Sequence, residues 1–337
     1  MSVLVTGAAG FIGFSVARAL LARGESVVGF DNFDPYYDVK LKEARAAELA
    51  KHAGFRMVRA DIASDGAFAA ALADKAIDRV VHLAAQAGVR YSITNPEVYI
   101  RTNIVGHFNV VEACRRRGDI KHLVYASSSS VYGGNTKLPF DVADKIDRPV
   151  SLYAATKAAN ELVGHCYSHL YGLPATGLRF FTVYGPWGRP DMALFKFTKG
   201  VLEGTPIDIY NDGEMYRDFT YVGDLVRGIR LLIDAAPVRP DRPEDIAEGD
   251  SLSPVAPFRV VNIGNGDKVR LMDFITAIEA ECGREAVKNF MPMQQGDVPA
   301  TWADASLLKS LTGYAPQTPF REGVARFVAW YRDYYRV

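Results

Sequence analysis

Short apolar runs rich in β-branched residues alternate with longer segments of helical periodicity through the first half of the chain. This alternation constrains the fold most, because a strand, a helix and a second strand in succession favour parallel pairing. The helices of such a chain cover both faces of its sheet. We therefore predict an α/β fold with a doubly wound parallel sheet. The apolar runs lie at residues 3–5, 26–30, 55–58, 79–83, 122–126 and 175–179.

The character of the sequence changes after Tyr184-Gly-Pro186, where the periodicity becomes less regular and proline, glycine and aromatic residues become frequent. We predict that residues 1–184 form an N-terminal lobe and that residues 185–337 form mainly a smaller C-terminal α/β lobe. Residues 218–262 are expected to return to the first lobe. Residues 236–258 contain five prolines and are expected to form an exposed loop.

Gly7, Gly10 and Gly13 follow the first predicted strand and open a predicted helix at residues 11–23. Glycines in this context permit a tight turn, and they let backbone N–H groups and the helix N-terminus approach a pyrophosphate. Asp31 ends the second predicted strand, where a carboxylate can bond both ribose hydroxyls of an adenosine and repels a 2′-phosphate. The pattern predicts a dinucleotide site that prefers NAD to NADP. The plainer interpretation of Asp31 is a helix cap or a turn residue.

Tyr153 and Lys157 lie four residues apart in a predicted helix at residues 153–171, which places both on one helix face. An ammonium near a phenol favours the phenolate, so we expect Lys157 to lower the pKa of Tyr153. Such a phenol can accept the proton of an alcohol that is losing hydride. The spacing alone is common on solvated helix faces. Its combination with the glycine turn and with the serine run at residues 127–130 is what indicates catalysis.

The bulk composition excludes several classes of partner. Lys and Arg together number 39, as do Asp and Glu, so no net charge attracts nucleic acid. No apolar run is long enough to span a membrane and the sequence opens on a strand, so we expect a cytoplasmic protein. Cys114, Cys166 and Cys282 are widely scattered, and we expect the first two to be buried thiols. The histidines show no ligand spacing, so no metal is expected, and the pair Tyr36-Tyr37 is interpreted as packing.

Several motifs together resemble the extended short-chain dehydrogenase/reductase family, in particular its nucleotide-sugar epimerases. The resemblance covers nearly the whole chain and implies a Rossmann-type, NAD-binding N-terminal lobe and a C-terminal lobe that binds a UDP-sugar. These family motifs are Gly7/Gly10/Gly13, Asp31-Asn32, His82-Leu-Ala-Ala85, Ser127–Ser130 with Val-Tyr-Gly133, Tyr153/Lys157, Arg217-Asp-Phe-Thr-Tyr-Val and Gln295-Gly-Asp-Val-Pro. A finer signature resembles the UDP-glucuronate 4-epimerases, in Asp31-Asn-Phe-Asp-Pro-Tyr-Tyr-Asp38, Ala85-Gln-Ala-Gly-Val-Arg-Tyr-Ser92 and Phe181-Thr-Val-Tyr-Gly-Pro-Trp-Gly-Arg-Pro-Asp-Met192.

This resemblance implies that the chain holds NAD permanently and interconverts UDP-glucuronate and UDP-galacturonate. Tyr153 would take the proton of the sugar C4 hydroxyl while hydride passes to the nicotinamide. The 4-keto sugar would then turn over, and hydride would return to its other face. Lys157 would bond the nicotinamide ribose, and Ser128 would hydrogen-bond the reacting oxygen. The other residues expected at the cofactor are the three glycines, Phe11, Ile12, Asp31, Asn32, Asp61, Ile62, Leu83, Ala84 and Ala85.

A group of hydroxyl residues, Ser129, Ser130 and Thr182, is expected to bind the C6 carboxylate without a cation. Many glucose-type epimerases have Asn at the position of Thr182. The plainer interpretation is a strand-end turn whose serines bond the backbone. Gln294 departs from the family pattern, because many relatives have a second diphosphate-binding arginine there. Arg217 is expected at the diphosphate. Arg189 is expected at the sugar, although a surface charge is its plainer interpretation. The remaining residues expected at the substrate are Gln86, Arg90, Ser128 and Tyr153.

Three other functions stay open. The chain could be a UDP-glucuronate decarboxylase, which oxidises C4 and then releases carbon dioxide. It could be a UDP-glucose 4-epimerase, which Thr182 and Gln294 disfavour. It could also be an NAD-binding sensor or scaffold without turnover, although the presence of Tyr153 and Lys157 argues against that. The family resemblance further implies a homodimer formed through helices near residues 96–117 and 153–171.

Overall fold

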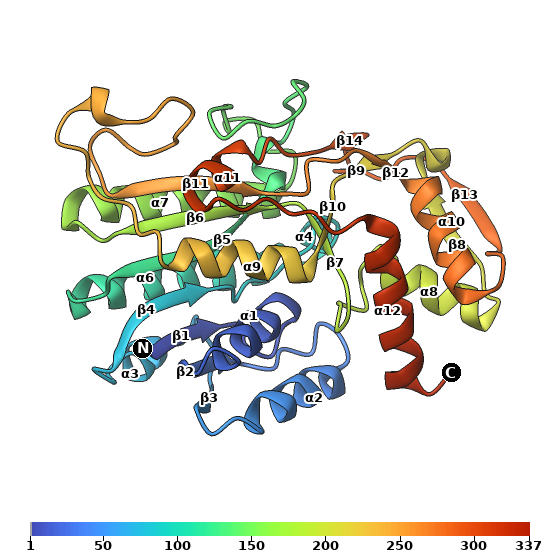
Figure 1. Cartoon of the computed structure of the whole chain (residues 1–337), viewed down its shortest axis with the longest axis horizontal. Coiled ribbons are helices and arrows are strands. Elements are labelled where there is room, and N and C mark those ends of the chain that lie inside the picture. The colour runs from blue at the N-terminus through green and yellow to red at the C-terminus, as the bar shows by residue number, and fades with distance from the viewer. Residues whose placement is uncertain (1) are drawn as a thin grey trace.

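The computed structural model describes residues 2–337, and its centre is a seven-stranded sheet (Figure 1). The strand order is β11-β6-β5-β4-β1-β2-β3, and every neighbouring pair is parallel. The chain therefore starts in the middle of the sheet and is wound outward in both directions. The predicted doubly wound α/β fold is confirmed. The strands are β1 Ser2–Thr6, β2 Ser26–Asp31, β3 Phe55–Arg59, β4 Ile77–His82, β5 His122–Ser128, β6 Ala175–Phe180 and β11 Phe258–Ile263.

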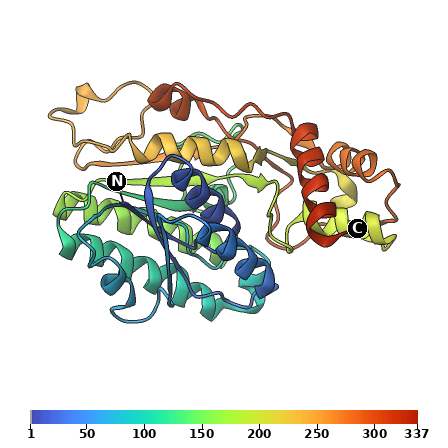
Figure 2. The same cartoon turned by 60° about the horizontal axis from the view of Figure 1, so that its bottom comes forward.

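Helices cover both faces of the sheet, because successive side chains of each strand point to opposite sides. In β1, Val3 and Val5 belong to one buried cluster and Leu4 belongs to another. In Figure 2 the yellow helix α9 and the teal helix α6 lie on opposite sides of the sheet. The first face carries α1 Phe11–Leu21, α2 Val39–Ala50, α9 Val222–Ile233 and α11 Ser306–Thr312, and the second carries α3 Ala67–Ala71, α6 Gly106–Arg117 and α7 Leu152–Tyr171.

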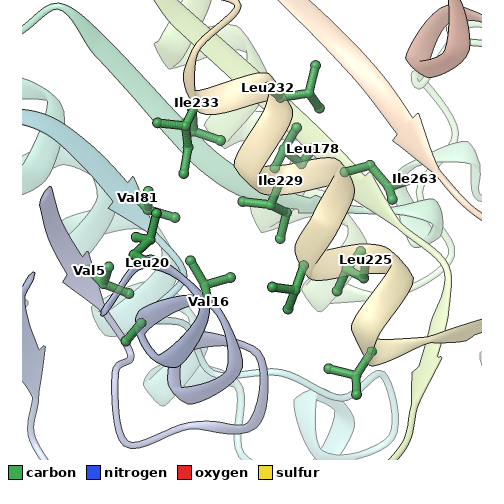
Figure 3. Close-up of a cluster of buried hydrophobic side chains, with 14 of the residues drawn as sticks. Val5, Val16, Leu20, Val81, Leu178, Leu225, Ile229, Leu232, Ile233 and Ile263 are labelled. Carbon is green, nitrogen blue, oxygen red and sulfur yellow. The ribbon is translucent and has the colours of Figure 1, made fainter. Parts of the chain in front are cut away.

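Helix α9 follows the short strand β10, Phe219–Tyr221, and packs against the main sheet (Figure 3). Its residues Leu225, Ile229 and Leu232 recur at helical spacing and are almost fully buried. They pack against Val16 and Leu20 of α1 and against the apolar face of the sheet. Strand β11 then pairs with β6 at the sheet edge. Residues 218–262 thus contribute one helix and one strand to the N-terminal lobe.

The C-terminal lobe is built from short strands and three longer helices around an aromatic-rich core. Phe219 and Phe274 stack with ring centroids 3.8 Å apart, and Phe195 contacts Phe327 and Tyr331. This lobe contains α8 Ala193–Glu203, α10 Leu271–Cys282 and α12 Phe320–Tyr335. Its strands are β7 Thr182–Tyr184, β8 Ile207–Tyr210, β9 Tyr216–Arg217, β10 Phe219–Tyr221, β12 Val269–Arg270, β13 Lys288–Met291 and β14 Ala300–Thr301.

The segment predicted as one helix at residues 96–117 is interrupted. Helix α5, Pro96–Tyr99, is followed by a π-helix, Ile100–Val105, before α6 begins at Gly106. The loop predicted at residues 236–258 is confirmed up to residue 257, with a 3-10 turn, Pro243–Asp245, inside it. Its end differs from the prediction, because Ala256 and Phe258 are buried and Phe258 begins β11. The remaining short elements are α4 Tyr91–Thr94 and the 3-10 turns Ser129–Tyr132 and Asn211–Gly213.

Candidate active site

A cavity of about 630 Å³ lies where β2, β4, β5 and β6 end, and residues of the C-terminal lobe form its other wall. In open parallel sheets, ligands bind beyond the carboxyl ends of the strands. The structure brings nearly all the predicted site residues to this one cavity. They are Gly7, Gly10, Phe11, Ile12, Gly13, Asp31, Asn32, Ile62, Leu83, Ala84, Ala85, Gln86, Arg90, Ser128, Ser129, Ser130, Tyr153, Lys157, Thr182, Arg189 and Arg217.

Asp61 is the exception among the predicted residues, since it is not part of the cavity wall that residues 2–337 form. Its carboxylate accepts a hydrogen bond from the Ala63 backbone N–H at 2.8 Å. It also pairs with Arg101 at 2.7 Å. These contacts orient the side chain along the surface turn after β3, whereas the neighbouring Ile62 does line the cavity. A cofactor role for Asp61 stays a prediction.

The glycine turn between β1 and α1 is too tight for side chains. Gly7 has a φ of +70°, and an added Cβ there would lie 2.9 Å from the Ala84 nitrogen. A Cβ on Gly13 would lie only 2.0 Å from the Gly7 carbonyl oxygen. The turn therefore exposes backbone N–H groups at the start of α1, the arrangement that accepts a dinucleotide pyrophosphate. The residues present fit the predicted NAD in this respect.

Asp31 ends β2 beside this turn and is buried. Its Oδ2 accepts a hydrogen bond from the Ala9 N–H at 3.0 Å, and its Oδ1 accepts one from the Phe33 N–H at 2.8 Å. The carboxylate thus supports the turn. Each oxygen can still accept a second hydrogen bond, as a ribose diol would require. The turn interpretation and the cofactor interpretation of Asp31 are therefore compatible.

Tyr153 and Lys157 occupy the first two turns of α7, which begins at Leu152 under a cap from Ser151. Lys157 is 4% exposed and its Nζ donates to the Ala126 carbonyl of β5 at 2.9 Å. The ring of Tyr99 meets the ring of Tyr153 edge-on, with centroids 6.1 Å apart. Strand β5 and the α5 segment therefore fix the pair at the cavity from two sides.

The pKa values of this pair differ from the expectation that Lys157 lowers the pKa of Tyr153. Burial raises the pKa of Tyr153, while a hydrogen bond with Ser128 and the charge of Arg189 oppose that rise. Burial lowers the pKa of Lys157 to about 8, and the Glu161 carboxylate opposes that shift. The groups that favour the Tyr153 phenolate in this structure are Ser128 and Arg189. They reach the phenol from β5 and from the C-terminal lobe.

All four serines of the run at the end of β5 line the cavity, and the first of them also has a structural role. Ser127 belongs to the cavity wall, but its hydroxyl is engaged, since it donates to the buried Glu161 carboxylate at 2.5 Å. Glu161 in turn forms a buried ion pair with Arg179 at 2.7 Å. Ser128 Oγ donates to Ser130 Oγ at 3.2 Å and also accepts from the Ser130 N–H. The buried pair beneath the run thus fixes the strand end that carries the exposed hydroxyls.

Thr182 and Arg189 follow β6 in the sequence, and both line the cavity. Thr182 begins β7, and its N–H donates to the Asp218 carbonyl at 3.1 Å. Arg189 is bound by Asp191, whose carboxylate also accepts from the Tyr36 hydroxyl at 3.2 Å. Burial alone would lower the pKa of Arg189, but Asp191 raises it above its ordinary value. Arg189 is therefore a fixed cation inside the site, and the surface-charge interpretation is wrong.

Two further arginines lie at the C-terminal side of the cavity. Arg90 pairs with Asp297 at 2.7 Å and lies over the Tyr210 ring, 4.2 Å from its centroid. Arg217 donates to the Tyr216 and Pro299 carbonyls at 2.9 and 3.2 Å. Both guanidinium groups belong to the cavity lining, so they are available to an anionic ligand.

Several residues in or beside the cavity were not predicted from the sequence. Tyr36, interpreted as packing, lines the cavity and binds Asp191. Lys42 of α2 also lines the cavity, and its Nζ donates to the Asp34 carbonyl at 2.7 Å. Asn103 lies in the π-helix, where its amide accepts from the Gln86 N–H and donates to the Gln86 carbonyl. The motif Asp31–Asp38 contains Tyr36 and was the signal that could have identified it. Asn103 had no such signal, because its role depends on the interrupted helix.

Across residues 2–337, no cluster of three or more His, Cys, Asp or Glu is arranged to hold a metal ion. No helix in the same range is long and apolar enough to cross a membrane. The cysteines are unpaired in the described chain, and Cys114 and Cys282 are buried. Cys166 is exposed, so the prediction of a buried thiol there is wrong, because its position on α7 faces outward.

The chain is similar to known proteins both in sequence and in fold. Residues 3–246 match the NAD dependent epimerase/dehydratase family. A probable UDP-glucuronate 4-epimerase of Rhizobium meliloti is 52% identical over 100% of this chain and 98% of its own length. A crystal structure of UDP-glucuronic acid 4-epimerase from Bacillus cereus, in complex with UDP-glucuronic acid and NAD, is 33% identical. It superposes with a TM-score of 0.87 and covers 99% of this chain and 100% of that one.

The fold alone does not separate the sugar specificities. A UDP-glucose 4-epimerase from Thermotoga maritima has a TM-score of 0.85 but is only 27% identical, with 99% and 100% of the two chains covered. Similarity of sequence is thus the more discriminating comparison. The match over most of the length, together with the glycine turn and the tyrosine–lysine pair at one cavity, leads to one conclusion: this chain belongs to the NAD dependent epimerase/dehydratase family.

Proposed function

We propose that this protein is an NAD-dependent isomerase that epimerises UDP-glucuronate at C4 to UDP-galacturonate. The observation that carries the proposal is the convergence of Tyr153, Lys157 and the hydroxyls of Ser128, Ser129, Ser130 and Thr182 on one cavity. The relatives named UDP-glucuronate 4-epimerase support the choice of sugar. NAD would be held by the glycine turn, Asp31 and Lys157. When bound, it supplies reversible hydride transfer.

In this proposal, Tyr153 moves the proton. Its phenolate takes the proton from the C4 hydroxyl when C4 is oxidised, and the phenol returns that proton to O4 after the sugar has turned over. Ser128 hydrogen-bonds O4 and the phenol. Arg189 favours the phenolate by its charge, and Lys157 would bond the nicotinamide ribose. The contributions of Ser128 and Arg189 offset the burial that raises the pKa of Tyr153.

We infer that Ser129, Ser130 and Thr182 hold the C6 carboxylate. A ketone at C4 is β to that carboxylate, and such acids lose carbon dioxide when the C5–C6 bond is aligned with the carbonyl π system. Hydroxyl and N–H donors can fix the carboxylate away from this alignment. Each tenfold preference for hydride return over decarboxylation needs only about 1.4 kcal/mol of barrier difference, which a few hydrogen bonds can supply.

The diphosphate would lie along the C-terminal wall, where Arg217 and Arg90 line the cavity. Arg90 already has a carboxylate partner in Asp297. An arginine can satisfy several acceptors at once, so a diphosphate can share or displace that partner. Gln86 and Arg189 complete the predicted contacts to the sugar. Since Gln294 is uncharged, the diphosphate would rely on Arg217 and Arg90.

The experiment that tests the proposal is incubation of the purified protein with UDP-glucuronate, followed by separation of the nucleotide sugars and measurement of carbon dioxide. We expect UDP-galacturonate without carbon dioxide, with Tyr153→Phe reducing the rate by about 10²–10⁴. Stoichiometric carbon dioxide would indicate the decarboxylase. A preference for UDP-glucose would indicate the other epimerase, and no turnover with tightly bound NAD would indicate a sensor or scaffold.

We also propose that the protein is a homodimer in the cytoplasm. The dimer proposal is supported by exposed apolar side chains on the predicted interface helices: Ile100 is 46% exposed, Phe108 48%, Leu162 68% and Leu170 60%. Such side chains on neighbouring helices indicate a surface that is covered by another chain. The two helices per subunit would pair as a four-helix bundle.

A further inference from the structure

Arg45 has a position that packing alone does not explain. It lies in the middle of α2, between Leu41 and Leu49 on the inward face of the helix. Its side chain is fully buried, with 0% of its surface exposed. Burial lowers its pKa below the ordinary value. An apolar residue would fill this position without the cost of desolvating a charge.

The guanidinium of Arg45 joins three segments that are distant in sequence. Nη1 donates to the Ala9 carbonyl at 3.0 Å and to the Tyr37 hydroxyl at 2.7 Å. Nη2 donates to the Trp187 carbonyl at 2.6 Å and to the Gly188 carbonyl at 3.3 Å. Within residues 2–337 it forms no ion pair with a carboxylate. Its hydrogen bonds therefore go to backbone and phenol oxygens whose positions it fixes.

Two of these segments are functional loops. Ala9 belongs to the glycine turn, and its N–H is held by Asp31 on the other side. Trp187 and Gly188 immediately precede Arg189, which lines the cavity. The Trp187 backbone has a φ of +64°, a conformation that a bulky residue adopts only when its surroundings impose it. Its ring is held by Phe14, Trp330 and Tyr334, and its carbonyl by Arg45.

We propose that Arg45 is a positioning residue that ties the cofactor turn to the loop carrying Arg189. The same guanidinium bonds the turn through Ala9 and the loop through Trp187 and Gly188, so a displacement of one is passed to the other. Arg45 therefore acts on the reaction through the positions of the glycine turn and of Arg189. We expect its largest effect on NAD and substrate binding, and a smaller fall in kcat, because Arg189 favours the Tyr153 phenolate. This inference extends the proposed function, because its substrate arm uses UDP-glucuronate.

The test compares Arg45→Met and Arg45→Lys with Arg259→Met in the NAD-loaded full chain. Arg259 is a matched control, since it is 8% exposed, pairs with Asp250 and lies outside the cavity lining. We expect Arg45→Met to lose NAD during gel filtration and to raise the KM for UDP-glucuronate about tenfold or more, with a smaller change in kcat. Arg259→Met should lower Tm but leave NAD content and KM unchanged.

Arg45→Lys keeps the charge, but a single ammonium cannot reproduce the fork that reaches both loops. Its NAD loss and KM should lie between those of the wild type and Arg45→Met, and this variant decides the question if Arg45→Met does not fold. Wild-type NAD content and KM in a folded Arg45 variant would overturn the inference. Absence of wild-type turnover would instead refute the proposed substrate, while NAD retention still tests Arg45.

Discussion

At the scale of single residues, the site is built from charges that the fold buries at a cost. Lys157 is 4% exposed, and burial lowers its pKa to about 8. Below that pKa the folded protein holds a buried ammonium, whereas the unfolded chain holds a hydrated one. Between about pH 8 and the ordinary lysine pKa, the unfolded chain binds more protons, so stability rises with pH there. Lys157 therefore lowers the free energy of unfolding at neutral pH, while its ammonium is needed for the proposed reaction.

Lys157→Met should therefore stabilise the protein while abolishing activity. We expect a gain on the order of 2 kcal/mol in the free energy of unfolding at pH 7, which shrinks as the pH rises from 8 toward 10. Denaturant unfolding of the apo-protein at several pH values measures this. A variant that is less stable than the wild type at pH 7 would show that the Ala126 hydrogen bond outweighs desolvation.

Thr182 gives the most direct test of sugar selection. Thr182→Ala should lower kcat/KM for UDP-glucuronate by roughly ten- to a hundredfold, because a hydrogen bond to a charged group is lost, and should change UDP-glucose use far less. It should also release some carbon dioxide. Thr182→Ser retains the hydroxyl and is the control. Equal losses with both sugars would place Thr182 outside the carboxylate pocket.

At the scale of helices and strands, the sequence predicts those site residues whose positions depend only on the element that carries them. The glycine turn, Asp31 and the tyrosine–lysine pair lie at strand ends or on a helix face, and each was identified from its own neighbourhood. The contact of Tyr36 with Asp191 and Arg189 was not predicted, because it joins segments more than 150 residues apart in the sequence. The π-helix that presents Asn103 has no marker residue in the sequence. Asn103 bonds Gln86 through its side-chain amide and Asn160 through its carbonyl, and both partners are distant in sequence.

The start of α1 can be tested with a single methyl group. Gly13→Ala places a Cβ about where the Gly7 carbonyl stands, so the turn must shift. We expect the loss of tightly bound NAD and a decrease of about 1–3 kcal/mol in stability. Gly134→Ala, where an added Cβ has 3.9 Å to its nearest neighbour, is the control. Unchanged NAD content in Gly13→Ala would contradict the assigned pyrophosphate site.

At the scale of the whole molecule, the cavity depends on both lobes. The Arg90–Asp297 pair joins the loop after β4 to the chain before β14, and Arg217 approaches from β9. The sequence predicted a lobe change near residue 185 from composition. It could not predict that α11 packs on α9 and β11, because short amphipathic segments fit many surfaces. The division into two domains stays a prediction.

The proposed dimer is tested by changing its most exposed apolar side chain. Leu162→Glu should convert the protein to a monomer at micromolar concentration, because an uncompensated charge would be buried at the interface. Sedimentation velocity measures the change. Val238→Glu is the control and should leave the oligomeric state unaltered, because Val238 is 75% exposed in the loop that follows α9. A monomeric wild type, or a dimeric Leu162→Glu variant, would be incompatible with these helices as the interface.

In the proposed reaction, C4 is oxidised and then reduced by the same hydride, with Tyr153 carrying the proton. The most direct measurement is the fate of deuterium in UDP-glucuronate labelled at C4, followed by NMR of the nucleotide sugars in ordinary water with no NAD added. We expect UDP-galacturonate that retains the deuterium at C4, and no carbon dioxide. Loss of the deuterium to solvent, or a pentose product with release of carbon dioxide, would contradict the proposed reaction.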